Sequence, residues 1–93
     1  MNPALRARRE TLAEEAVIKF AHGPQLDQLQ EECCELSVEV SHTRRGRGDI
    51  RKLVEELADV VIMVEQAKRI VPRALFEEEL SRKLDRLETK IRG

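Results

Sequence analysis

Apolar residues recur at helical spacing along most of the chain, so the pattern predicts four helices and no strand. The predicted helices span residues 4–21, 24–43 and 49–70 and the segment that follows Pro72. Asp49 is a natural N-cap for the third helix, and Pro72 cannot continue it. The segment His22-Gly23-Pro24 is predicted to end the first helix, because glycine favours a C-terminal cap and proline favours a new helix start.

The second and third predicted helices form an antiparallel hairpin if the basic, glycine-containing segment 44–48 between them is a turn. Residues that face each other in such a hairpin have a constant sum of residue numbers. Leu29 and Val64 share this sum with Leu36 and Leu57, so one register brings the apolar faces of both helices together. A single turn between the two helices therefore allows all these apolar residues to face one another.

The run Val60–Val64 on the third helix is apolar on every side. A helix of this kind needs burial on all faces, which one hairpin and two flanking helices of a short chain do not easily supply. We therefore expect this run to pack on a second copy of the chain in a homo-oligomer. The predicted fold is an all-α four-helix bundle with a central antiparallel hairpin, formed by residues 1–93 as one domain and completed by oligomerisation.

The composition excludes several classes of partner. Charged residues make up 38% of the chain, yet the net charge is −1, so no general attraction to nucleic acid or to a membrane is expected. Trp and Tyr are absent, which argues against a platform for stacking bases. The longest apolar run is too short to span a bilayer, and no signal peptide is visible. Adjacent Cys33 and Cys34 make a poor disulfide on a helix and indicate reduced thiols in a cytoplasmic protein.

Two acidic clusters lie on the predicted hairpin. Glu32 and Glu35 are three residues apart on its first helix, as are Glu56 and Asp59 on its second, so each pair projects from one helix face. Glu32 with Asp59, and Glu35 with Glu56, have the same sum of residue numbers, which predicts four carboxylates at one height. Such crowded negative charges repel unless protons or a cation intervene. Because hard divalent cations take oxygen ligands, the pattern predicts a Mg²⁺ or Mn²⁺ site.

Glu-Glu-x-x-Glu at residues 31–35, followed by Glu-x-x-Asp at residues 56–59, resembles the signature of the MazG-like all-α nucleoside triphosphate pyrophosphohydrolases. The resemblance covers roughly residues 20–91 and is strongest to the short, single-domain members of phages and bacteria. Membership would imply a MazG-like bundle and metal-dependent hydrolysis of a nucleoside triphosphate to the monophosphate and pyrophosphate. It would also imply a homodimer or homotetramer, located in the host cytoplasm if a phage encodes it.

The resemblance also implies roles for individual residues. Two or three Mg²⁺ or Mn²⁺ ions would be held by Glu32, Glu35, Glu56 and Asp59. Glu31 and Glu35 are the candidates for a catalytic role. Glu31 points ~100° away from Glu32 around the helix. It is therefore open whether Glu31 contacts a further ion, orients the attacking water or is merely solvated.

Substrate contacts are predicted at two places. Gln25 and Gln28 share the helix face of the metal ligands, where their amides suit a base edge or a sugar hydroxyl, unless both are simply solvated. Lys83 and Arg86 on the fourth helix are candidates for the pyrophosphate end, because similar short family members carry basic residues near the site. The alternative for these two cations is ion pairing with the glutamates at positions 77–79.

The substrate base is open at this point. Phage members that act on purine nucleotides make dGTP or GTP the leading substrate, with dUTP or phosphoribosyl-ATP as alternatives on the same fold. A hypothesis of another class is a non-catalytic helical oligomerisation module whose acidic patches bind nothing. Against that hypothesis, aligned carboxylates destabilise a hairpin that has only a structural role.

Overall fold

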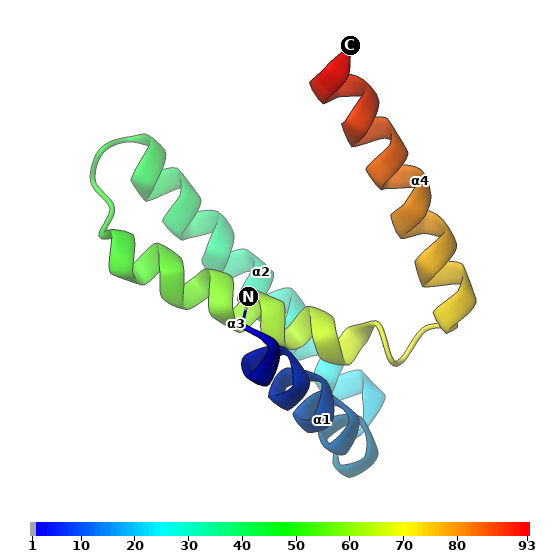
Figure 1. Cartoon of the computed structure of the whole chain (residues 1–93). Coiled ribbons are helices and arrows are strands. Elements are labelled where there is room, and N and C mark those ends of the chain that lie inside the picture. Colours follow the sequence, from blue (N-terminus) through cyan, green and yellow to red (C-terminus); the bar gives the residue numbers. More distant parts are fainter. Residues whose placement is uncertain (1) are drawn as a thin grey trace.

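The computed structural model describes residues 2–93, which form four helices and no strand (Figure 1). The helices are α1 (Pro3–Lys19), α2 (His22–Arg44), α3 (Ile50–Ala67) and α4 (Arg73–Arg92). The prediction of an all-α chain is confirmed. No helix within residues 2–93 combines the length and the apolar character needed to cross a membrane.

Several helix boundaries follow from local chemistry. Asn2 caps α1, since its Oδ1 accepts a hydrogen bond of 2.9 Å from the backbone N–H of Leu5. Asp49 caps α3 as predicted, and its Oδ1 accepts a hydrogen bond of 2.9 Å from the backbone N–H of Arg51. Between α2 and α3, Gly46 has a φ of 70°, a left-handed conformation that glycine adopts without steric cost. The chain can therefore reverse sharply at the predicted turn.

The prediction for the junction between the first two helices is wrong. Helix α1 ends at Lys19, and the segment 22–24 opens α2 instead of closing α1. Pro24 is the third residue of α2, where backbone N–H groups have no acceptor inside the helix. The missing N–H of proline costs nothing there, so α2 can begin upstream of it.

The centre of the structure is the predicted hairpin, in which α2 packs antiparallel along α3 (Figure 1). Helix α1 packs against α3. Helix α4 makes no extensive contact with the other three and projects away from them. Pro72, with φ of −59° and ψ of 124°, directs the chain away from α3. The predicted four-helix bundle is therefore not closed within one chain: three helices form a unit, and the fourth is a projecting arm.

The interior of this unit is small. Within residues 2–93, the buried apolar residues are Ala13 on α1 and Met63 on α3. The hairpin seam is half open, because Leu57 is 46% exposed and Val64 is 42% exposed. Soluble monomers of this size rarely leave so much apolar surface in water.

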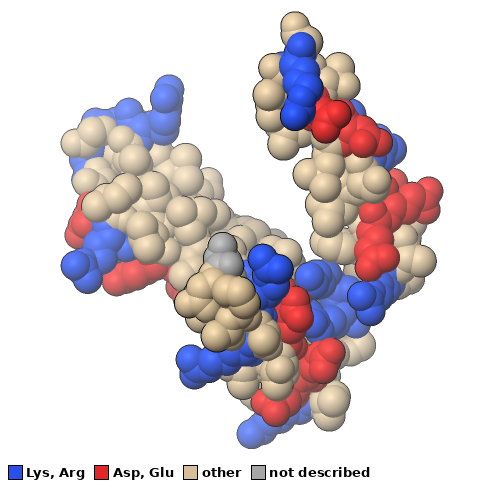
Figure 2. All heavy atoms as spheres, in the orientation of Figure 1, with Lys and Arg blue, Asp and Glu red and all other residues tan. Residues whose placement is uncertain are grey.

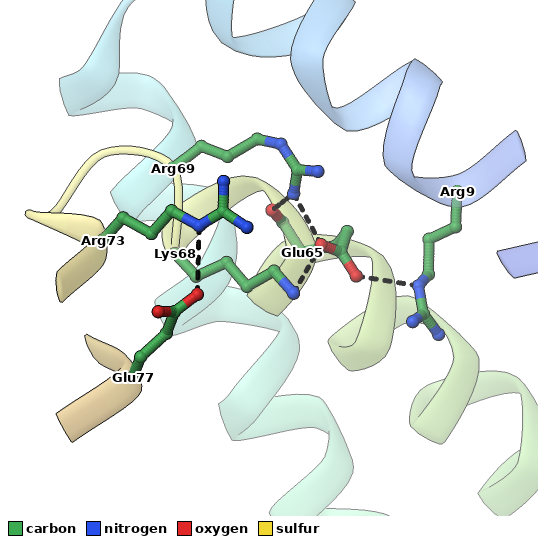
Figure 3. A network of polar contacts seen from close by, with 6 residues as sticks. All are labelled: Arg9, Glu65, Lys68, Arg69, Arg73 and Glu77. Carbon is green, nitrogen blue, oxygen red and sulfur yellow. Dashed lines mark hydrogen bonds and ion pairs between the residues drawn. The ribbon is translucent and has the colours of Figure 1, made fainter. Parts of the chain in front are cut away.

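One buried carboxylate ties α1 to α3 (Figure 3). The side chain of Glu65 is 4% exposed, and its Oε1 accepts a hydrogen bond of 2.9 Å from Nε of Arg9 on α1. Its Oε2 lies 2.8 Å from Nζ of Lys68 and accepts a hydrogen bond from Nη1 of Arg69. Burial by itself would raise the pKa of Glu65. The hydrogen bonds and charges of Lys68 and Arg69 outweigh this effect and bring the pKa below its ordinary value, to about 2. Folding therefore favours the ionised form of this carboxylate.

We expect Glu65→Gln to lower the free energy of unfolding by about 3 kcal/mol at pH 7, measured by urea denaturation at fixed protein concentration. The pKa of Glu65 lies below its ordinary value, so the ionised carboxylate stabilises the folded state. This contribution is complete above ~pH 5 and is lost as the pH falls towards 2. The control is Glu77→Gln, which removes the exposed ion pair with Arg73 and should cost about 0.5 kcal/mol. Equal losses from the two variants would contradict this role for Glu65.

Candidate metal centre

The two acidic clusters meet on one side of the α2–α3 hairpin. Helix α2 supplies Glu32 and Glu35, and α3 supplies Glu56. One oxygen from each of these three carboxylates lies within 4.8 Å of the others. Ligand oxygens about 2.0–2.6 Å from one divalent cation have mutual separations in this range. The hairpin register brings the three residues together, as expected from their numbering, and their role as metal ligands stays a prediction.

Asp59, the fourth predicted ligand, lies outside this group of three. It is near enough to Glu32 for its charge to raise the pKa of that carboxyl. Packed helices cross at an angle, so residues at the same height in a hairpin need not be equally close. The predicted set of four is thus three converging carboxylates, which we call the acidic triad (Glu32, Glu35 and Glu56), with Asp59 beside them.

Glu32 is the most constrained member of the acidic triad. It is half-buried, and its Oε1 accepts a hydrogen bond of 2.7 Å from Nε2 of Gln28. Burial raises the pKa of Glu32, the negative charges of Glu35 and Asp59 raise it further, and the hydrogen bond from Gln28 opposes them. A cation at the triad would remove the repulsion among these carboxylates.

Two triad oxygens lack hydrogen-bond partners. Oε2 of Glu32 and Oε2 of Glu56 are both shielded from solvent, and neither has a partner within the described chain. Buried polar atoms are nearly always paired, since leaving one unpaired costs free energy. Two shielded, unpaired carboxylate oxygens on facing helices fit a hard divalent cation such as Mg²⁺ or Mn²⁺. Cys33 and Cys34 are exposed and do not join the group, so the donors are all oxygens.

The remaining candidates on α2 differ in their placement. Glu31 is exposed and lies outside the triad, next to Glu32 in sequence. Gln28 lies at the triad through its hydrogen bond to Glu32. This contact places the Gln28 amide next to the candidate metal position, as the spacing predicted. Its nitrogen donates the hydrogen bond to a triad carboxylate, and a contact between its oxygen and a substrate stays a prediction.

Gln25 has a structural task that the sequence did not reveal. It is 5% exposed, and its Nε2 donates hydrogen bonds to the backbone carbonyls of Phe20 at 3.0 Å and Ala21 at 3.3 Å. The amide thus ties the start of α2 to the end of α1. Oε1 of Gln25 is buried and has no hydrogen-bond partner within residues 2–93. The alternative that Gln25 is simply solvated is therefore wrong, and its contact with a substrate stays a prediction.

Lys83 and Arg86 are not brought to the triad within one chain. Both are exposed on α4, which makes no extensive contact with α2 or α3. Space-filling atoms show α4 as a separate arm that carries charges of both signs (Figure 2). The alternative of ion pairing with the nearby glutamates finds no support at two of these positions, since Glu77 pairs with Arg73 and Glu79 pairs with Arg82.

A hollow of about 700 Å³ lies between α1, the α3–α4 connection and α4. Apolar side chains such as Val17, Phe76 and Leu80 line it together with charged groups of both signs, including Arg69 and Glu10. None of the triad carboxylates lines this hollow. This hollow is therefore separate from the triad.

The resemblance to the MazG-like pyrophosphohydrolases rests on the two acidic motifs of the sequence and stays a prediction. Comparison of the chain with protein-family models, with curated proteins and with solved structures gave no match.

Proposed function

We propose that the protein is a metal-dependent nucleoside triphosphate pyrophosphohydrolase, which converts a (d)NTP and water to the (d)NMP and pyrophosphate. The observation that carries the proposal is the convergence of the acidic triad, in which two oxygens are shielded and unpaired. The order of the two motifs along the antiparallel helices supports it, because the resembling family has the same order. The leading substrate is dGTP or GTP, with dUTP or phosphoribosyl-ATP as alternatives.

The charges of the site and of the substrate make a metal necessary. A triphosphate carries about four negative charges, so a bare acidic cluster repels it. In the proposal, two or three Mg²⁺ or Mn²⁺ ions are held by Glu32, Glu35, Glu56 and Asp59. When bound, the metal supplies positive charge for the phosphate oxygens and lowers the pKa of a nearby water.

The protein groups around the triad have distinct tasks in this proposal. Gln28 orients the Glu32 carboxylate through its hydrogen bond, as outer-shell groups do at metal sites. Glu35 completes the triad from the same helix, and Glu31 is an exposed carboxylate beside it that can accept a proton from water. The arrangement thus provides ligands, an orienting amide and a candidate base within a few residues of α2.

The active unit in this proposal is a homodimer or homotetramer. The apolar run Val60–Val64 directly follows Asp59, and its members Val61, Ile62 and Val64 are between 39% and 49% exposed. A second copy that covers this run would lie next to the carboxylates. It would therefore also help to enclose a substrate that the open side of one hairpin leaves in water.

Hydrolysis of a nucleotide panel tests the proposal. Pyrophosphate should form from dGTP or GTP faster than from dUTP or phosphoribosyl-ATP, only with Mg²⁺ or Mn²⁺ present, and a chelator should abolish it. In oxygen-labelled water the label should enter the monophosphate, because water attacks the α-phosphorus. Label in the pyrophosphate would place the attack at the β-phosphorus, and release of orthophosphate with a nucleoside diphosphate would exclude this reaction class.

A second candidate, the non-catalytic oligomerisation module, is favoured by the large exposed apolar surface. Thermal melting with and without Mg²⁺ or Mn²⁺ separates it from the hydrolase. A bound ion raises the free energy of unfolding by about 2.7 kcal/mol at one hundred times its Kd. A midpoint that responds to neither ion, together with no hydrolysis of the panel, would favour the module.

A further inference from the structure

Helix α4 carries a narrow apolar stripe that no other helix covers. Leu80, Leu84, Leu87 and Ile91 follow steps of four, three and four residues, and each is between 47% and 70% exposed. This spacing gives two apolar residues in seven, which is the pattern of a two-stranded coiled coil. In that pattern the four residues occupy positions d, a, d and a of consecutive heptads.

The charges beside the stripe favour one partner and one direction. With Leu80 at position d, Lys83 and Lys90 fall at g and Glu88 falls at e. In a parallel pair of α4 helices, position g contacts position e of the next heptad, so Lys83 of each copy would meet Glu88 of the other. In an antiparallel pair, g faces g, so Lys83 would meet Lys90 instead. The parallel pair therefore gains two contacts between opposite charges, one from each copy. The antiparallel pair would instead have two contacts between like charges, which destabilise it.

We propose that α4 pairs with α4 of a second copy as a short parallel coiled coil, in which Leu84 and Leu87 each pack against their own counterparts. The contact between Glu88 and Arg92, 3.6 Å long and largely exposed, does not compete, because an exposed pair of this kind contributes little. This interface is separate from the run Val60–Val64 on α3. It depends neither on a metal nor on hydrolysis, so either proposal can fail without the other.

A single cysteine tests the direction of pairing. In a Cys33→Ser/Cys34→Ser background, Leu84→Cys should form an intermolecular disulfide under mild oxidation, since a parallel pair places position 84 opposite itself. The matched control Asp85→Cys, one residue along and away from the stripe, should not. A mixture of Leu84→Cys and Leu87→Cys chains that forms only the mixed disulfide would show antiparallel pairing. That result, or no disulfide in chains that keep their helical circular dichroism, overturns the proposal.

Charge reversal provides a second, independent readout. Lys83→Glu and Glu88→Lys should each raise the dissociation constant of the α4 contact about tenfold, measured by sedimentation of otherwise unmodified chains over a range of protein concentrations. The double variant Lys83→Glu/Glu88→Lys should restore it, because the pairs again have opposite charges. If Lys83 instead contacts a phosphate of the substrate, Lys83→Glu lowers activity and Glu88→Lys does not rescue it. That failure of rescue overturns the pairing and leaves the proposed hydrolase intact.

Discussion

Replacing a triad carboxylate by its amide is expected to abolish metal-dependent hydrolysis while the helices survive. Glu32→Gln, Glu35→Gln or Glu56→Gln removes one of three oxygens that lie within 4.8 Å of one another, so kcat/KM should fall ~100-fold or more. Asp59→Asn should have a smaller effect, because Asp59 lies beside the triad and not in it. The measurements are pyrophosphate release in saturating Mg²⁺ and far-ultraviolet circular dichroism.

The same substitutions should have an opposite effect on stability without metal. Folding raises the pKa of Glu32 through burial and through the charges of Glu35 and Asp59, so its ionised form disfavours the folded state at neutral pH. Glu32→Gln should therefore raise the melting midpoint of the metal-free protein and abolish the further rise on adding Mg²⁺. The matched control is Glu55→Gln, an exposed carboxylate next to Glu56 in sequence but outside the triad. Near-native activity in two of the three triad variants would mean that the assigned site is wrong.

A charge in the apolar run of α3 should dissociate or unfold the protein. Ile62 is 49% exposed in the single chain, and its neighbour Met63 is buried at 7% exposure, so Ile62 is the member of the run that faces away from the chain's own interior. Ile62→Glu would place a carboxylate in the contact with a second copy, where burying an unpaired charge costs several kcal/mol. Light scattering at assay concentration should show a smaller species, and hydrolysis should fall with it.

Position 50 provides the matched control for this experiment. Ile50 lies on the same helix, is 69% exposed and is outside the run Val60–Val64. Ile50→Glu should leave the assembly intact, and an acidic residue in the first turn of a helix is favoured by the helix dipole. A fully active species of 10.7 kDa, from either the unmodified chain or the Ile62 variant, would remove the case for an obligatory oligomer.

Features that depend on short stretches of chain could be predicted from the sequence. Helical periodicity, the Asp49 cap and a turn containing glycine define α2 and α3, and an antiparallel pair leaves few registers in which both apolar faces meet. The convergence of the acidic triad follows from that register. The predicted junction at His22 is wrong because Gly23 and Pro24 are equally acceptable in the first turn of a helix.

Tertiary structure decided what depends on the distances between helices. Asp59 lies outside the triad, and the Gln25 amide is hydrogen-bonded at the α1–α2 junction. Helix α4 packs extensively on no other helix of its own chain. Glu65 also contacts Arg9, 56 positions away, and no short sequence pattern predicts this contact. By itself the sequence determined four helices, their main hairpin and the meeting of its acidic faces, because periodicity and capping act within a few residues. The crossing of the helices and the burial of single side chains decided the rest, because they arise only when distant segments pack.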